Sequence, residues 1–264
     1  MPAEPTAPPV FPFVVGCGRS GTTLLRALLD AHPLLAVAPE SHFVVALDPG
    51  GQRIGRRRFR RALARSPWFA LWDLDPAAIA LERRPRFADA VRATFAAYAR
   101  ARGKPRYADK TPHYVSHLPR LAARFGEARF VHLIRDGRDV AASLRRVPWG
   151  PPTLDGAAAV WARRVREGRA AGGALGPGRY REVRYEALVA APQAVLDDLL
   201  PWLGLPPAVL RHDPARLVVP HAAHHERLRL PPTPGLRDWR RELTAGEVAE
   251  VQAVAGPELS ALGY

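Results

Sequence analysis

The chain has 264 residues, 47% of them hydrophobic, which is enough for one α/β domain with a sizeable core, and its single cysteine, Cys17, excludes an internal disulfide framework. It has no charged-then-apolar leader and no run of about 18 apolar residues, so we expect a cytoplasmic protein without stable membrane insertion. The net charge of +14 suggests a nucleic-acid partner, but only two of the 39 basic residues are lysines, so the charge is more simply a bias toward arginine and we expect no such partner.

The first predicted elements surround a glycine-rich loop. The proline-rich residues 1–10 predict a disordered tail, and residues 11–264 predict a single domain. Phe11–Val15 reads as a strand buried on both faces. After the loop, the spacing of leucines predicts a helix over Thr22–Ala31, which a His-Pro pair ends, and Leu35–Ala38 predicts a second strand.

The later elements continue the alternation of strands and helices. A helical insertion is expected over about Gly50–Gly103, followed by a short strand at Arg106–Ala108 and a helix at Tyr114–Phe125. Arg129–Ile134 is the clearest remaining strand, and a helix containing Val140–Leu144 follows it. This order predicts an α/β fold in three layers, a P-loop-type parallel sheet flanked by helices, with ligands at the carboxyl ends of the strands.

The loop GCGRSGTT resembles a nucleotide-binding P-loop whose lysine is replaced by Thr22. Its backbone N–H groups and the positive end of the following helix make an anion site without a lysine. The hydroxyls of Ser20, Thr22 and Thr23 can each donate a hydrogen bond to a phosphate there. Arg19, inside the loop, can reach a group attached beyond that phosphate.

The strand RFVHLI ends at Arg135, where a nucleoside triphosphatase would place an aspartate for magnesium. A second anion site is therefore expected, with no metal. Asp136 and Asp139 are interpreted as a helix N-cap and a first-turn charge. A zinc site in HAAHH (221–225) is disfavoured, because no cysteine or well-spaced carboxylate accompanies it. A P-loop kinase or NTPase and a basic nucleic-acid-binding module remain as alternatives.

Two motifs carry a specific resemblance. VVGCGRSGTTLLRALLDAHP resembles the 5′-phosphosulfate loop of sulfotransferases that use 3′-phosphoadenosine 5′-phosphosulfate (PAPS), and RFVHLIRDGRDVAASL resembles their 3′-phosphate strand, loop and helix. VAPESHF and ADKTP are similar to the segments that carry a catalytic glutamate and a catalytic lysine, the former in the protein-tyrosine and heparan branches. EVRYEALV and PGLRDWRREL extend the similarity toward the C-terminus. The chain thus resembles a bacterial member of the PAPS-dependent sulfotransferase family, near the protein-tyrosine and heparan branch.

The resemblance implies a donor site with two separated phosphate positions. Its donor-binding residues would be Gly18, Arg19, Ser20, Gly21, Thr22 and Thr23 around the 5′ phosphate, Arg135 and Ser143 around the 3′ phosphate, and Tyr185 near the adenine. Arg19 and Lys110 would stabilise charge that develops on the bridging and transferring oxygens. PAPS would be a co-substrate that leaves as adenosine 3′,5′-bisphosphate (PAP), and no metal is required.

The acceptor hydroxyl must lose a proton to a nearby base. Glu40 is the first candidate, because two branches of the family place a glutamate in the matching segment. His113 is the rival, since cytosolic sulfotransferases carry a histidine two residues after the matching lysine, whereas here the spacing is three. His42 is expected to orient Glu40 or to pack in the core.

The acceptor itself is left open as a small molecule, saccharide, lipid or phenol. The insertion and the loop at 205–234 are expected to shape its pocket, where Trp68, Phe69 and Trp72 are either pocket wall or core. The basic run Arg53–Arg65 is interpreted as a solvated helix face, with a site for an anionic acceptor as the alternative.

Overall fold

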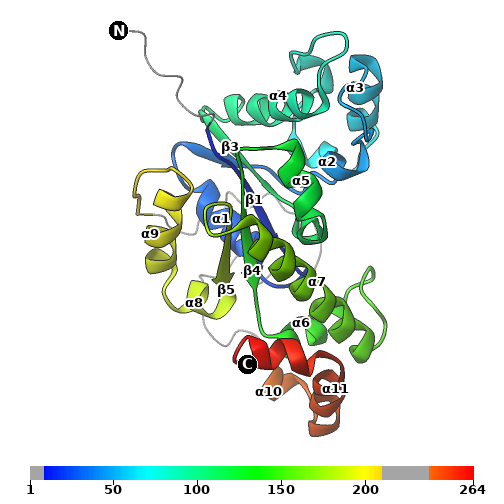
Figure 1. The fold of residues 1–264 in the computed structure, drawn as a ribbon, viewed down its shortest axis with the longest axis vertical. Helices are drawn as coiled ribbons and strands as arrows, with labels where there is room; N and C mark the ends of the chain where they lie inside the picture. Colours follow the sequence, from blue (N-terminus) through cyan, green and yellow to red (C-terminus); the bar gives the residue numbers. More distant parts are fainter. Residues whose placement is uncertain (1–8, 210–237) are drawn as a thin grey trace.

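In the described part of the chain, five parallel strands form the centre of the fold (Figure 1). The structure is a computed structural model and describes residues 9–209 and 238–264. The HAAHH segment, most of the loop at 205–234 and most of the expected N-terminal tail lie outside the described residues. The strands are β1 (Phe11–Gly16), β2 (Leu35–Val37), β3 (Arg106–Lys110), β4 (Ala128–Ile134) and β5 (Tyr180–Arg184).

The strand order is β2-β3-β1-β4-β5, so β1 lies in the middle of the sheet. Every residue of β1 is buried, as the apolar run predicts for a strand covered on both faces. The chain leaves β1 toward β2 and β3 on one side and reaches β4 and β5 on the other. The carboxyl end of β1 is therefore a topological switch point, the place where open parallel sheets bind ligands.

Alternate side chains of β1 enter two different cores. Phe11, Phe13 and Val15 pack with residues of α4 and α5, whereas Val14 packs with residues of α1, α8 and α9. Two helix layers thus enclose the sheet, and the predicted three-layer α/β architecture is confirmed. The helices are α1 (Thr22–Asp30), α2 (Phe43–Ala46), α3 (Arg56–Ala64), α4 (Phe87–Arg100), α5 (Leu118–Arg124), α6 (Gly137–Leu144), α7 (Leu154–Leu175), α8 (Tyr185–Ala190), α9 (Pro192–Trp202), α10 (Trp239–Glu242) and α11 (Ala245–Ala261).

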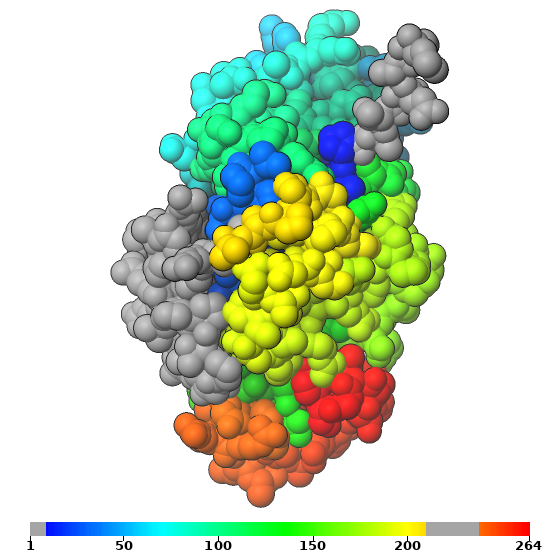
Figure 2. Space-filling model, turned by 90° about the vertical axis from the view of Figure 1, so that its left-hand side faces the viewer, coloured from blue at the N-terminus to red at the C-terminus, as the bar shows by residue number. Residues whose placement is uncertain are grey.

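The C-terminal helices extend the fold below the sheet. In Figure 1 α6, α10 and α11 gather at the lower end of the molecule, and α3 and α4 lie at the upper end. Figure 2 shows the C-terminal helices below the yellow surface of α8 and α9. A third buried cluster joins α6, α7 and α11 through side chains such as Leu144, Trp161 and Val251. This cluster fixes the helix that starts at the carboxyl end of β4.

The helix expected over Tyr114–Phe125 is wrong in its first half. Pro112–His117 forms a 3₁₀ helix, η3, and the α-helix α5 begins only at Leu118. The physical reason is Pro119, which has no N–H to continue an α-helical ladder and is tolerated only in a first turn. The predicted helix at Thr22–Ala31 is confirmed as α1, one residue shorter.

The segment expected as an insertion contains α3, two short 3₁₀ helices and α4. The 3₁₀ helices are η1 (Phe69–Trp72) and η2 (Pro76–Ala78). α4 packs against β1 through Phe95, so this helix belongs to the layer that covers the sheet. α3 buries Phe59 and Leu63, while several of its arginines are exposed, as expected for a solvated helix face.

Candidate active site

The glycine-rich loop connects β1 to α1 at the switch point. Gly21, the N-cap of α1, has φ 95°, a conformation that favours glycine. A Cβ built on Gly21 would lie 2.4 Å from the ring of Tyr185, so only glycine fits beneath that ring. Arg19 also has a left-handed backbone, with φ 72°. The loop therefore has the sharp turn that aims backbone N–H groups at an anion.

Polar side chains of this loop are buried where the helix begins. Ser20 is 1% exposed and Thr22 is 3% exposed, while Thr23 and Gly18 are partly exposed. Among the residues that the structure describes, the Ser20 hydroxyl has no hydrogen-bond partner. A buried hydroxyl without a partner costs free energy, and a phosphate oxygen at the loop would satisfy it.

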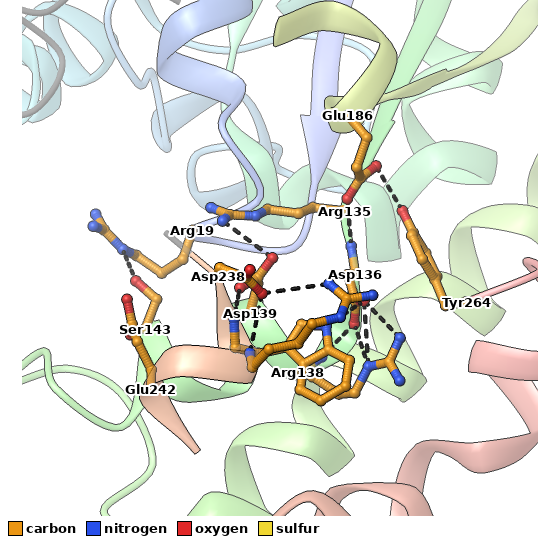
Figure 3. A network of polar contacts seen from close by, with 12 residues as sticks. Arg19, Arg135, Asp136, Arg138, Asp139, Ser143, Glu186, Asp238, Glu242 and Tyr264 are labelled. Carbon is orange, nitrogen blue, oxygen red and sulfur yellow. Dashed lines mark hydrogen bonds and ion pairs between the residues drawn. The ribbon is translucent and has the colours of Figure 1, made fainter. Parts of the chain in front are cut away.

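The second predicted anion site lies beside the first. Arg19 Nε donates a hydrogen bond of 3.1 Å to Ser143 Oγ, which joins the loop after β1 to helix α6 (Figure 3). Arg135 is 5% exposed, its Nη2 lies 3.3 Å from Asp139 Oδ2, and its guanidinium lies 4.4 Å from the centre of the Tyr185 ring. Four residues predicted for the donor site thus meet in one place, with Asp139 and the ring fixing the arginine.

The two aspartates after β4 have the structural roles expected from the sequence. Asp136 caps α6 and accepts a hydrogen bond of 2.9 Å from the backbone N–H of Arg138, whose guanidinium it also binds. Asp139 lies in the first turn and accepts a hydrogen bond of 2.8 Å from the backbone N–H of Trp239. In the described ranges, no group of three or more His, Cys, Asp or Glu side chains could hold a metal ion.

Glu40 and Lys110 form an ion pair at the ends of β2 and β3. Lys110 Nζ lies 2.7 Å from Glu40 Oε1, and His42 Nε2 lies 3.1 Å from Glu40 Oε2. Burial raises the pKa of Glu40, but the Lys110 ammonium and the contacts with His42 outweigh it and hold the pKa of the carboxyl well below its ordinary value. Burial lowers the pKa of Lys110, and Glu40 offsets part of that effect.

A buried hydroxyl network positions the turn that carries Glu40. Ser41 Oγ donates to Asp109 Oδ2 and lies 2.9 Å from the Tyr114 hydroxyl, and the Ser41 backbone N–H donates to Thr111 Oγ1 at 2.9 Å. Asp109 is fully buried, and desolvation raises its pKa to about 6. This network ties the residue after Glu40 to the end of β3, which also carries Lys110.

His113 lies next to this pair, but in the described part of the chain no hydrogen bond joins it to Glu40. Its ring stacks on that of His42 with 4.7 Å between the centroids. Burial, together with His42 and Arg164, lowers the pKa of His113 to about 4. Its ring is therefore neutral at neutral pH, so it keeps an acceptor nitrogen.

The aromatic residues after α3 divide between core and surface. Phe69 and Trp72 are 2% and 0% exposed and belong to the core. Trp68 is 39% exposed and its ring lies 4.2 Å from that of His42. Cys17 is buried, and burial raises its pKa to about 12, which suppresses the thiolate that nucleophilic chemistry requires.

The contacts of Ser41, Asp109 and Tyr114 were missed by sequence reasoning. Asp109 is adjacent to Lys110 in ADKTP, and an acidic residue directly after a predicted strand was the available signal. The expected strand Arg106–Ala108 is too short, since Asp109 and Lys110 pair with β1. Their polar side chains are tolerated in a central strand because Ser41 and Glu40 bind them.

Comparison with known proteins places this arrangement in a family. A model of the sulfotransferase family matches residues 10–208. The chain belongs to the sulfotransferase family. This membership confirms the resemblance that the two phosphate motifs predict.

Individual members of the sulfotransferase family show how far the similarity extends. The nodulation protein NoeE of Sinorhizobium fredii is 29% identical over 97% of this chain and 66% of its own length. A putative protein-tyrosine sulfotransferase of Caenorhabditis briggsae is 28% identical over 73% of this chain and 65% of its own length. The chain thus spans slightly less than two thirds of the length of these curated relatives.

The fold is also that of solved sulfotransferase domains. A sulfotransferase domain from the curacin biosynthetic pathway superposes with a TM-score of 0.68, at 21% identity, over 98% of this chain and 99% of that domain. The domain from a Synechococcus olefin synthase gives a TM-score of 0.57 at 23% identity, over 95% and 96% of the two chains. In the described part of this family member, no helix is long and apolar enough to cross a membrane.

Proposed function

We propose that this chain transfers a sulfuryl group from PAPS to a hydroxyl group of an acceptor. The observation that carries the proposal is the meeting of two anion sites, linked by the Arg19–Ser143 hydrogen bond, at the switch point of a sulfotransferase fold. A donor with two phosphates needs two such sites. The buried Ser20 hydroxyl, which has no hydrogen-bond partner among the described residues, fits a phosphate at the loop.

This geometry and the family membership support the proposed donor-binding roles. The 5′ phosphate would lie against the loop, the 3′ phosphate against Arg135 and Ser143, and the adenine near Tyr185. The loop residues in this proposal are Gly18, Arg19, Ser20, Gly21, Thr22 and Thr23. The bound donor supplies an activated sulfuryl group, and the protein contributes position and charge.

The transfer step needs a base at the acceptor hydroxyl and positive charge near the phosphate oxygens of the leaving group. Glu40 would take the acceptor proton, while Arg19 and Lys110 stabilise negative charge on the leaving phosphate oxygens. Lys110 fits because its ammonium is buried and already lies beside the carboxylate. His113 is the second candidate for the base, since its neutral ring stacks beside His42.

The acceptor is proposed only as a hydroxyl compound: a small molecule, saccharide, lipid or phenol. The relatives named as protein-tyrosine sulfotransferases and as a nodulation protein support no single choice among these. We also propose that residues 11–264 work as one domain, because three buried clusters pack around one sheet.

Sulfur-labelled PAPS with a panel of phenols, saccharides and hydroxylated lipids tests this function. We expect at least one acceptor to gain the mass of a sulfuryl group, with one PAP released for each transfer. A Lys110→Met variant, which keeps the length of the side chain and removes its charge, should lose the transfer. Phosphorylation of an acceptor that requires Mg²⁺ and ATP, with no use of PAPS, would contradict the proposal.

A further inference from the structure

The carboxylate of Glu40 is held from two sides by two different residues. Lys110 Nζ binds Oε1 at 2.7 Å, and His42 Nε2 binds Oε2 at 3.1 Å. The side chains of Glu40 and His42 are 27% and 26% exposed, whereas that of Lys110 is 6% exposed. His42 is thus the partner on the more accessible side of the carboxylate.

The His42 ring is fixed on both faces. Trp68 lies 4.2 Å from it with an interplanar angle of 33°, and His113 lies 4.7 Å from it with an angle of 20°. The backbone of His42 has a positive φ of 48° with ψ −35°, a conformation that a non-glycine residue adopts only at a cost in free energy. His42 thus keeps an unfavourable backbone conformation in the arrangement in which its ring stacks between Trp68 and His113 and contacts Glu40.

Lys110 alone cannot fix the carboxylate during the proposed transfer. Its ammonium is a compact charge that the donor's leaving oxygens also attract, so its hold on Oε1 is shared once the donor is bound. A base must stay within a narrow geometry of the hydroxyl that it deprotonates. The contact between His42 and Glu40 does not depend on PAPS, because it is made through Oε2, whereas Lys110 contacts Oε1.

We propose that His42 is a positioning residue that holds Glu40 through Oε2 and so keeps Oε1 directed at the acceptor hydroxyl. This inference rests on the proposed function. In the transfer step the acceptor oxygen bonds to sulfur, the bond from sulfur to the bridging phosphate oxygen breaks, and the acceptor proton goes to Glu40 Oε1. His42 donates its Nε2–H to Oε2 throughout and keeps that proton.

Two substitutions of His42 separate the hydrogen bond from the ring stack. His42→Phe keeps a flat ring between Trp68 and His113 but removes the N–H donor. His42→Gln loses the ring but places an amide N–H near the position of Nε2. We expect His42→Phe to lower kcat about tenfold or more, with KM for the acceptor within about twofold, and His42→Gln to retain kcat within about threefold of wild type.

The assay measures the release of PAP from PAPS with p-nitrophenol as the acceptor. Without added p-nitrophenol, water is the acceptor. Wild-type turnover by His42→Phe together with impaired turnover by His42→Gln would show that the ring only packs, and would overturn the proposal. A double-variant cycle adds an independent readout. If His42 acts through Glu40, adding His42→Phe to Glu40→Gln should cause little further loss, whereas a full additional loss would also overturn it.

PAP affinity, measured by calorimetry on the same variants, distinguishes a failure of this inference from a failure of the proposed function on which it rests. We expect wild type and both His42 variants to bind PAP with similar affinity. A wild-type protein that neither binds PAP nor releases it from PAPS would refute the proposed function itself. If wild type binds PAP and releases it from PAPS, and His42→Phe is fully active, only the proposed role of His42 is refuted.

Discussion

Replacing Arg135 by alanine should abolish the ability of this protein to distinguish PAP from adenosine 5′-phosphate. These nucleotides differ only in the 3′ phosphate, which we propose that Arg135 binds. The arginine is 5% exposed, paired with Asp139 at 3.3 Å and placed 4.4 Å from the Tyr185 ring. Its guanidinium is therefore already ordered and loses little freedom when an anion binds.

The magnitude follows from the type of bond that is lost. A hydrogen bond between a charged donor and phosphate contributes roughly 1.5–3 kcal/mol, so PAP affinity should fall about 10- to 150-fold. Adenosine 5′-phosphate makes no such bond, and its affinity should stay within about threefold. The ratio of the two dissociation constants should accordingly approach one.

Competition binding with both nucleotides on wild type and variant measures this ratio. Arg138→Ala is a matched control, because Arg138 lies only three residues after Arg135, in the first turn of α6, and is also buried, but binds Asp136 and covers Trp239. It should lower stability while leaving the ratio unchanged. An equal loss of affinity for both nucleotides in Arg135→Ala would show that this arginine supports the fold or the 5′ site, and would refute the reasoning.

Three further predictions follow from the acceptor side of the site. Glu40→Gln should lower kcat about 10²-fold or more while PAP affinity stays nearly unchanged, as steady-state kinetics would measure. His113→Ala is measured in parallel. If only His113→Ala lost turnover, His113 and not Glu40 would be the base. Ser41→Ala leaves buried groups without a partner and should lower the free energy of unfolding in urea by about 1–3 kcal/mol; an unchanged midpoint would exclude the anchoring role. The folded-state pKa of Asp109, about 6, is raised above 3.8 because the group is buried, so the folded state binds the proton more tightly and stability falls as pH rises from about 4 to 6. The free energy of unfolding of Asp109→Asn, measured by urea titration, should therefore rise relative to that of wild type by up to roughly 3 kcal/mol as the pH rises between those values. A difference between variant and wild type that does not change with pH would contradict this prediction.

The donor side of the site was predictable because its signals are local in the sequence. The loop lies between one strand and one helix, and Arg135 and Ser143, eight residues apart, lie just before another helix and near its end. Parallel strands bring their carboxyl ends to one edge, so the fold class alone predicts that the two motifs meet. The Arg19–Ser143 hydrogen bond, across 124 residues, follows from that arrangement.

The acceptor side was only partly predictable, because its contacts join residues far apart in the chain. Ser41 reaches Asp109 across 68 residues, and no periodicity or turn signal encodes that contact. The stack of His42 between Trp68 and His113 likewise depends on where three segments far apart in the sequence meet. Glu40 was named from the resemblance, whereas its pairing with Lys110 on the next strand needed the register of the sheet.

Calorimetry of PAP binding in the presence of a divalent-ion chelator tests the central claim most directly, since it needs no knowledge of the acceptor. The loop has Thr22 in place of the P-loop lysine and β4 ends at Arg135, so two cation-lined anion sites should bind PAP without a metal. We predict one PAP bound per chain, with an affinity that the chelator leaves unchanged. Tight binding of ATP only together with Mg²⁺, and no binding of PAP, would contradict the account.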